Sequence, residues 1–202
     1  MRSKRSGILA LLLALGVVLV LNRPKPSPNP SGAYIVLDPG HGGSDPGAVD
    51  PATGTREADL NLAQALTLKE YLARLGYRVG FTRTTDETVP LPERIARARR
   101  LGARLFVAVH HDIPTATRPG VYYSPRPGSE ELARTIAAAL GPNAWVLPSS
   151  ASRFGRLYID DFLGPAVLVE FGPTKPTSRE ERIARAQAVA SPIVEFARRY
   201  VA

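Results

Sequence analysis

Residues 34–43 read Tyr34-Ile-Val-Leu-Asp-Pro-Gly-His-Gly-Gly43, a short apolar run that leads directly into a glycine-rich turn. A run of this length, bounded by proline and glycine, is typical of a buried strand. The segment Ala58–Leu75 follows, with leucine and alanine at helical spacing and Gly76 as a helix stop. A strand, a turn and a helix in this order begin a strand–helix–strand unit, which predicts a parallel sheet.

The alternation of strand and helix patterns continues to the end of the chain. We expect further strands at 77–82, 105–110, 121–124 and 166–170, and weaker strand patterns lie at 145–147 and 157–159. We expect helices at 92–101, 130–140 and 179–201. This order predicts a single α/β domain with a mostly parallel twisted sheet and helices on both faces. In such sheets, functional sites form at the carboxyl ends of the strands.

Composition narrows the possible functions. The 202 residues carry a formal net charge of +8, but residues 1–32 hold five basic residues and no acidic ones. The remaining excess is mild, and no basic stripe interleaved with aromatic residues occurs, so we expect no binding of nucleic acid. The chain contains no cysteine, which excludes thiolate metal ligands, disulfides and lipoprotein processing.

The N-terminal segment indicates export. Basic residues at positions 2, 4 and 5 precede an apolar run from Gly7 to Leu21, which is typical of an export signal. The run is short for a spanning helix, which needs roughly 17–25 residues, but it ends without a small-residue cleavage site. We therefore favour a signal anchor over a cleaved signal peptide at residues 1–21.

Prolines at positions 24, 26, 28 and 30 predict an extended linker at residues 22–33. The linker would join the anchor to a folded domain at residues 34–202. We therefore expect a domain that is exported across the cytoplasmic membrane and held at the cell envelope, facing the periplasm or the wall.

Four residues whose side chains can bind a metal ion or transfer a proton lie at positions that a parallel sheet would bring together at one edge. His41 follows the first strand, Glu57 begins the first helix, and His110 and Glu170 end two further strands. Two imidazoles and a carboxylate with an open fourth position make a catalytic zinc site, and a second carboxylate can handle protons. Plainer roles stay open at this point, since a histidine after a strand can be a loop residue and Glu57 can be a first-turn charge.

Five segments, in order, resemble the zinc-dependent N-acetylmuramoyl-L-alanine amidases, the amidase type 3 family of peptidoglycan hydrolases. They are Ile35–Gly43 with Asp45-Pro-Gly47, Glu57–Leu62, Thr82–Asp86 with Leu91–Arg94, Leu105–His110 and Pro165–Glu170. The resemblance implies that His41, Glu57 and His110 hold zinc. It also implies that Glu170 is the catalytic base towards water and then the acid towards the leaving amine. The implied substrate is the amide between N-acetylmuramic acid and L-alanine in peptidoglycan.

Neighbouring residues carry secondary expectations. Gly42 and Gly43 can let a bulky substrate approach the metal or can simply form a tight turn. His111 should point away from His110, because strand residues alternate between faces, and we expect it to contact substrate or solvent. The chain departs from the family pattern at His111-Asp112, at the loop Phe171–Thr174 and at Arg99.

Two other functions compete with an active wall amidase. One is a catalytically inactive wall-binding protein with the same fold, and the other is a zinc amidohydrolase that acts on another amide. The presence of all four chemical residues argues against the first. Only residues 111–169 separate His110 from Glu170, which leaves little room for an additional helix that would block the active site until an activator displaced it. We therefore predict that the domain is active without a protein activator, and we expect a monomer.

Overall fold

The computed structural model describes residues 34–200, so the expected anchor and linker at residues 1–33 lie outside the described chain. Six strands form one sheet in the order β2-β1-β3-β6-β4-β5. The strands are β1 (Ile35–Pro39), β2 (Val79–Phe81), β3 (Leu105–Asp112), β4 (Gly120–Tyr123), β5 (Trp145–Pro148) and β6 (Ala166–Pro173). All neighbouring strands are parallel except β4 and β6, which confirms the mostly parallel sheet.

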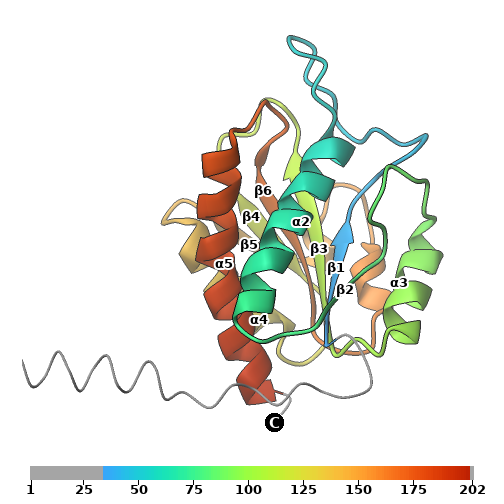
Figure 1. Ribbon diagram of the computed structural model, residues 1–202, viewed down its shortest axis with the longest axis vertical. Helices are drawn as coiled ribbons and strands as arrows, with labels where there is room; N and C mark the ends of the chain where they lie inside the picture. The colour runs from blue at the N-terminus through green and yellow to red at the C-terminus, as the bar shows by residue number, and fades with distance from the viewer. Residues whose placement is uncertain (1–33, 201–202) are drawn as a thin grey trace, which may run out of the picture.

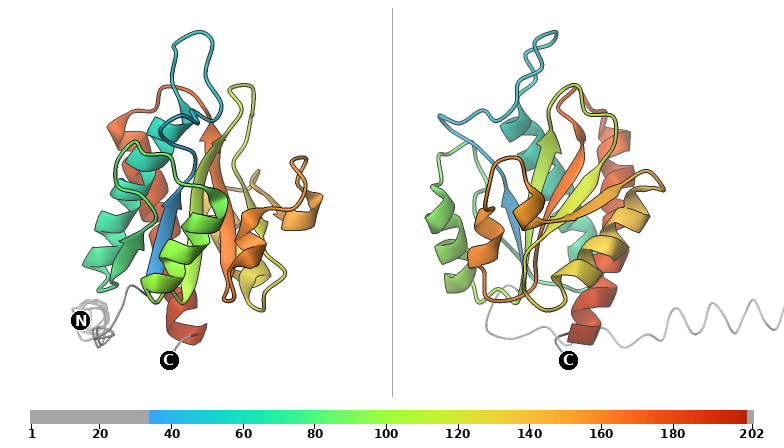
Figure 2. Two further views of the ribbon diagram at one scale, coloured as in Figure 1. Left: turned by 90° about the vertical axis from the view of Figure 1, so that its right-hand side faces the viewer. Right: turned by 180° about the vertical axis from the view of Figure 1, so that it is seen from behind.

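Helices cover both faces of the sheet, as the sequence predicts. Figures 1 and 2 show that the helices form two groups, one on each face of the sheet. The first group is α2 (Glu57–Arg74), α4 (Ser129–Leu140) and α5 (Arg179–Tyr200), and the second is α3 (Leu91–Arg100) with η2 (Tyr158–Asp161). Helices α2, α3 and α5 run opposite to β1, β3 and β6, so α2 and α3 both begin at the edge where these strands end (Figure 1).

Two hydrophobic clusters, one on each face, hold the layers together. The larger lies under α2, α4 and α5, and its central residues include Leu68, Val107 and Ile193. The smaller lies under α3 and η2 and includes Phe106 and Ala108. Odd-numbered residues of β3 therefore face the larger cluster and even-numbered residues face the smaller one, as the two-residue period of a strand requires.

The expectation of a strand at 157–159 is wrong. These residues lead into η2, which packs on the face of the sheet instead of pairing at its edge. Ile159 is buried in the smaller cluster with Phe106, and the Tyr158 hydroxyl donates a hydrogen bond to buried Asp38. Contacts between distant parts of the chain thus override the local strand pattern.

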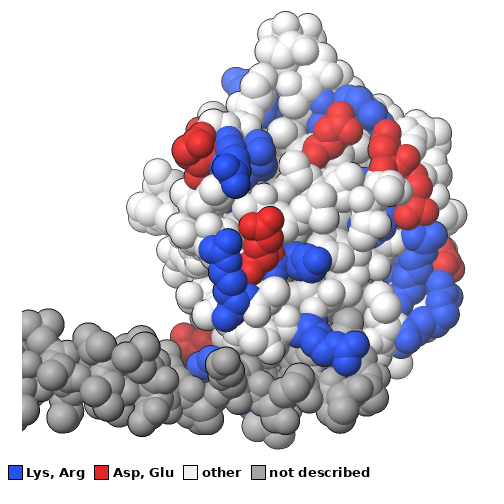
Figure 3. Space-filling model, viewed as in Figure 1, with Lys and Arg blue, Asp and Glu red and all other residues white. Residues whose placement is uncertain are grey.

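The surface over α2 and α5 carries charges of both signs. Figure 3 shows Lys and Arg interspersed with Asp and Glu on this face. Such mixing differs from the continuous basic surface that nucleic-acid binding needs. Within residues 34–200, none of the helices combines the length and the hydropathy needed to cross a membrane.

The larger cluster generates a stability prediction. Leu68 is fully buried on α2, whereas Leu66 on the same helix is 39% exposed. We predict that Leu68→Ala lowers the free energy of unfolding by about 2–5 kcal/mol, because it leaves a cavity in a packed core. Leu66→Ala should cost less than about 1 kcal/mol. Denaturant titration of both variants measures the difference, and equal losses would contradict this assignment of the core.

Candidate metal centre

The loop after β1 presents His41 in an unusual backbone conformation. His41 has φ of 59°, and it is the only residue other than glycine with positive φ in the described range 34–200. The left-handed region costs free energy for such a residue, so the surrounding structure must impose it. The ring Nδ1 of His41 lies 2.8 Å from Asp45 Oδ2. This contact orients the ring and directs its Nε2 towards Glu57, from which it is 3.2 Å away.

Two buried arginines fix this loop by its carbonyl oxygens. Arg94 donates to the carbonyls of Pro39 and His41, each at 2.7 Å. Arg83 donates to the carbonyls of Pro39 and Gly40, each at 2.8 Å. Asp38 is fully buried and forms an ion pair with Arg94 at 2.8 Å. The charge of Arg94 is therefore balanced inside the fold while its remaining donors hold the His41 loop.

Glu57, the first residue of α2, lies between the two histidines. Its Oε2 is 3.2 Å from His41 Nε2, and its Oε1 is 2.9 Å from Nδ1 of His110 on β3. Asn61, one helical turn further on, donates to Oε1 at 3.1 Å, and the backbone N–H of Ala48 donates to Oε2 at 3.0 Å. Burial alone raises the pKa of Glu57, but the contacts with His110 and His41 outweigh burial and hold this pKa far below its ordinary value.

His110 packs directly against the backbone of Gly40. A Cβ atom at position 40 would lie 2.1 Å from the His110 ring, so no larger residue fits there without moving the ring. The centroids of the His41 and His110 rings are 5.0 Å apart. Nε2 of His110 is buried and has no hydrogen-bond partner within residues 34–200. Nδ1 of His110 is the nitrogen that faces Glu57, so it is the ring atom available to an ion shared with Glu57.

The donor set of His41, Glu57 and His110 fits a metal ion. One ligand atom from each residue lies within 4.8 Å of those of the other two. Ligands at 2.0–2.1 Å in a tetrahedral zinc site are separated by about 3.4 Å, which is close to the observed contacts with Glu57. Two nitrogens and a carboxylate also match the donors of catalytic zinc sites. These residues could therefore hold zinc and leave a position open for a reacting group.

Glu170 lies beside this group on the neighbouring strand. It is the register partner of His110 between β3 and β6, and both side chains lie on the face of the smaller cluster. Its Oε2 is buried without a hydrogen-bond partner among residues 34–200. Burial, followed by the negative charges of Glu57 and Asp112, raises the pKa of Glu170 well above its ordinary value. A carboxyl group in this state suits proton transfer near neutral pH.

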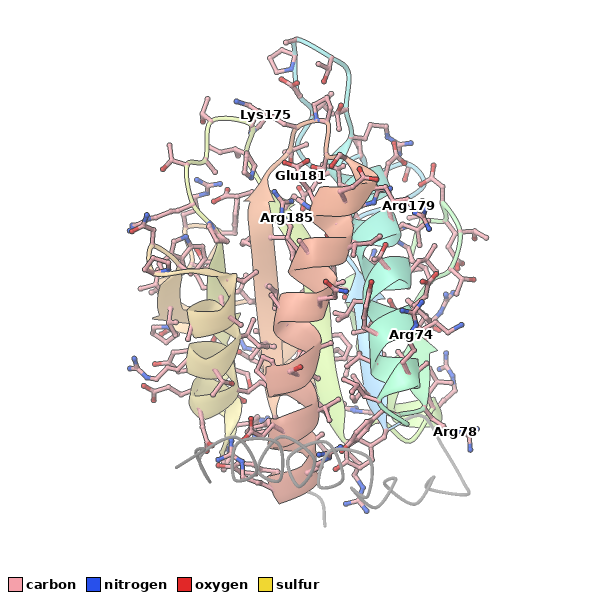
Figure 4. The ribbon with its side chains drawn as sticks, turned by 60° about the vertical axis from the view of Figure 1, so that its left-hand side comes forward. Arg74, Arg78, Lys175, Arg179, Glu181 and Arg185 are labelled. Atoms are coloured by element: carbon pink, nitrogen blue, oxygen red, sulfur yellow. The ribbon has the colours of Figure 1, made fainter. Side chains whose placement is uncertain are left out.

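His111 lies on the opposite face, which corrects the expectation of a contact with substrate or solvent. The alternation of β3 points its ring into the larger cluster beside Phe171, and only 2% of the residue is exposed. Its Nδ1 lies 2.9 Å from Asn61 Oδ1. Burial, together with the charge of Arg185 on α5 (Figure 4), lowers the pKa of His111 to about 3. The ring is therefore a neutral core residue that helps to position Asn61.

The two glycines after His41 take different places. The backbone N–H of Gly43 donates to Asp86 Oδ1 at 2.7 Å, which anchors the turn. Gly42 lines a cavity of about 330 Å³ that also contains His41, Leu91 and Tyr158. A substrate contact at either glycine stays a prediction.

Several supporting residues escaped the sequence analysis. Asn61 could have been found from its position four residues after Glu57, which places it on the same face of a helix. Arg83 and Arg94 lie in two of the segments that resemble the family, but their burial could not be predicted, because arginine is ordinarily exposed. Arg99, which departs from the family pattern, donates to the carbonyl of Asp161 at 2.7 Å and so lies away from the metal centre.

The sequence of the chain is similar to those of one group of enzymes. Residues 35–195 match the family described as N-acetylmuramoyl-L-alanine amidase. The chain is 37% identical over 137 residues to the N-acetylmuramoyl-L-alanine amidase AmiC of Neisseria meningitidis serogroup B, covering 65% of this chain and 33% of AmiC. It is 31% identical over 180 residues to the probable cell wall amidase LytH of Staphylococcus epidermidis, covering 85% of this chain and 60% of LytH.

The fold is similar to solved amidase structures. The catalytic domain of CwlV from Bacillus (Paenibacillus) polymyxa superposes with a TM-score of 0.70 at 26% identity, covering 81% of this chain and 97% of that domain. The CwlD amidase of Clostridioides difficile, solved in complex with the GerS lipoprotein, gives 0.72 at 25% identity, covering 81% and 98%. By contrast, the chain spans about a third of the length of the AmiC proteins that it matches.

The environment of Glu170 generates a prediction for the metal-free protein. Because its pKa is raised in the fold, the stability that protonated Glu170 contributes is present below the ordinary pKa, near 4.5, and is lost as the pH rises through the raised value. Glu170→Gln removes this titration. We predict that the variant is more stable than the parent by about 1–3 kcal/mol near pH 7 and that this advantage shrinks towards pH 4.

Thermal or denaturant unfolding between pH 4 and pH 8, with chelator present, measures this effect. Glu195→Gln is the matched control, since Glu195 is exposed on α5. A Glu170→Gln variant whose stability relative to the parent does not change with pH would contradict the buried, raised-pKa state of Glu170.

Proposed function

Because this chain belongs to the N-acetylmuramoyl-L-alanine amidase family, we propose that it is a zinc-dependent hydrolase of peptidoglycan. The bond cut would be the amide between N-acetylmuramic acid and L-alanine, for remodelling of the wall or separation of cells. One observation carries the proposal: His41, Glu57 and His110 converge at one edge of the sheet, with Glu170 beside His110 in register.

The residues of the site have separate tasks. Zinc held by His41, Glu57 and His110 would polarise the scissile carbonyl and lower the pKa of water to about 7. Glu170 accepts a proton from the attacking water as the water oxygen bonds to the carbonyl carbon. As the carbon–nitrogen bond breaks, Glu170 gives this proton to the amine nitrogen of L-alanine. Asp45 and Asn61 hold His41 and Glu57 in orientation throughout.

The setting of the enzyme is part of the proposal. We assign residues 1–21 to a signal anchor, 22–33 to a linker and 34–202 to the catalytic domain. The apolar run at Gly7–Leu21 and the alternating prolines support an exported, membrane-attached enzyme at the cell envelope. The family match over 35–195 agrees with the expected start of the domain. The enzyme would act as a monomer.

Digestion of purified peptidoglycan tests three points together: whether the protein is active, whether it needs zinc and which amide it cuts. The full-length protein should release peptides that begin with L-alanine, as identified by mass, and a chelator should stop the release until zinc is restored. Activity should appear with no second protein added. Stoichiometric zinc without peptide release would favour the inactive wall-binding alternative, and cleavage of a different amide would favour the other amidohydrolase.

Variants separate metal binding from proton transfer. We predict that His41→Ala loses both bound zinc and turnover, because it removes a ligand. Glu170→Gln should keep stoichiometric zinc but lose at least 10²–10⁴-fold in rate, the usual effect of removing a general base. Zinc analysis and peptide release are measured on the same samples. A near-normal rate in Glu170→Gln would assign the proton transfer to another residue.

A further inference from the structure

A row of four register partners crosses the sheet beside the metal centre. His110 on β3 pairs with Glu170 on β6, Glu170 pairs with Gly120 on β4, and Gly120 pairs with Trp145 on β5. Paired residues on adjacent strands lie on the same face of a sheet. The sheet therefore continues from the metal centre, past Glu170, to a tryptophan two strands away.

The absence of a side chain at Gly120 decides where the indole lies. A Cβ atom at this position would be 1.9 Å from the six-membered ring of Trp145, so the indole lies directly over the Gly120 backbone. The ring of Tyr122 meets the indole edge-on, with centroids 4.7 Å apart. Tyr122 and Gly120 together hold the aromatic surface next to Glu170.

These residues line a cavity distinct from the one beside His41. The cavity has a volume of about 320 Å³, and its lining includes Glu170, Tyr122, Trp145, Phe154 and two arginines, Arg118 and Arg153. The segment that carries Arg153 and Phe154 follows β5 and projects from the sheet (Figure 2). Phe154 is 71% exposed at the rim. An aromatic floor with cationic walls suits an extended chain that carries negative charge.

Arg153 and Arg118 differ in their ion-pair and hydrogen-bond partners. Arg153 forms an ion pair with Asp112 at 3.0 Å, and about half of its side chain stays exposed. Arg118 is exposed and has no hydrogen-bond or ion-pair partner within the described chain, residues 34–200. A guanidinium without a partner at the wall of a cavity is free to bind a carboxylate with two parallel hydrogen bonds.

The cavity on the other side of the metal centre offers no such cation. Its one arginine, Arg94, forms an ion pair with buried Asp38 and also donates to the carbonyls of Pro39, His41 and Val89, so most of its donors and its charge are already engaged. The remaining lining includes Pro90, Leu91 and Tyr158. This cavity therefore suits a neutral group rather than an anion.

We propose that the cavity lined by Glu170, Trp145, Arg118 and Arg153 binds the peptide side of the scissile amide and that Arg118 and Arg153 select peptides with a free carboxylate near the cleaved bond. The inference rests on the proposed function, in which Glu170 returns its proton to the amine nitrogen. The amine, and the peptide that continues from it, must then lie in the cavity that contains Glu170. The sugar and its lactyl group occupy the cavity beside His41.

Two soluble N-acetylmuramoyl peptides test the selection. They differ only at the second residue of the peptide, where one carries a free carboxylate and the other the corresponding carboxamide. For the zinc-loaded full-length protein, we expect kcat/KM to be about tenfold higher for the carboxylate form, as one charge-assisted hydrogen bond provides. Arg118→Gln should reduce this ratio towards one, and Arg153→Gln should reduce it as well.

Arg156→Gln is the matched control. Arg156 lies on the same projecting segment and pairs with Asp161 at 2.5 Å, but it does not line the cavity. Its removal should leave the ratio unchanged. Arg153 lines the same cavity as Glu170, so Arg153→Gln is expected to lower kcat/KM for both substrates. The ratio of the two kcat/KM values therefore isolates the contribution of Arg153 to recognition of the carboxylate.

Binding of the free peptides separates this inference from the proposed function. The acidic and amidated peptides, without the sugar, are titrated calorimetrically into the full-length protein and into Arg118→Gln. Tighter binding of the acidic peptide by the parent alone supports the subsite even if the protein hydrolyses neither substrate, a result that would overturn only the proposed function. Equal affinities and equal kcat/KM values for the two forms, or a preference that survives both substitutions, would overturn the inference.

Discussion

Two buried guanidinium groups hold the loop on which the metal centre depends. Arg83 and Arg94 bind the carbonyl oxygens of residues 39–41, and buried Asp38 balances the charge of Arg94. Breaking such a pair leaves an uncompensated buried charge, which is strongly destabilising. The loop is thus kept in a conformation that His41 would not adopt alone, with its ring directed at Glu57. A preorganised ligand loop would let the proposed zinc ion bind with little further ordering cost.

Two glycines set the dimensions of the site on either side of Glu170. Gly40 lets the His110 ring lie against the loop, and Gly120 lets the Trp145 ring lie against the sheet. One close approach brings the proposed metal ligands together, and the other creates the aromatic surface of the proposed peptide site. Glu170 is in register with His110 on one side and Gly120 on the other, so one row of residues across the sheet joins the proposed metal chemistry to the proposed recognition of the peptide.

The sequence predicted the features that depend on local pattern and strand direction. Parallel strands end at the same edge, so placing His41 after one strand and His110 and Glu170 at the ends of two others sufficed to bring them together. Alternation separated His110 from His111. Features that depend on contacts between distant segments were not predicted. Tertiary packing, which residue type and spacing do not encode, determines three of these features. They are the contacts of Arg83 and Arg94 with the loop, the burial of His111 against Phe171 and the position of the 3-10 helix over Phe106. The indole over Gly120 likewise requires the pairing of β4 with β5.

The central claim is that His41, Glu57 and His110 form one zinc site beside Glu170. Anomalous diffraction at the zinc absorption edge, from crystals grown with stoichiometric zinc, tests it most directly. We expect one strong peak surrounded by these three side chains, with Arg83 and Arg94 still bound to the loop. A peak at other residues, or the absence of a peak with the three side chains in contact as described, would contradict it.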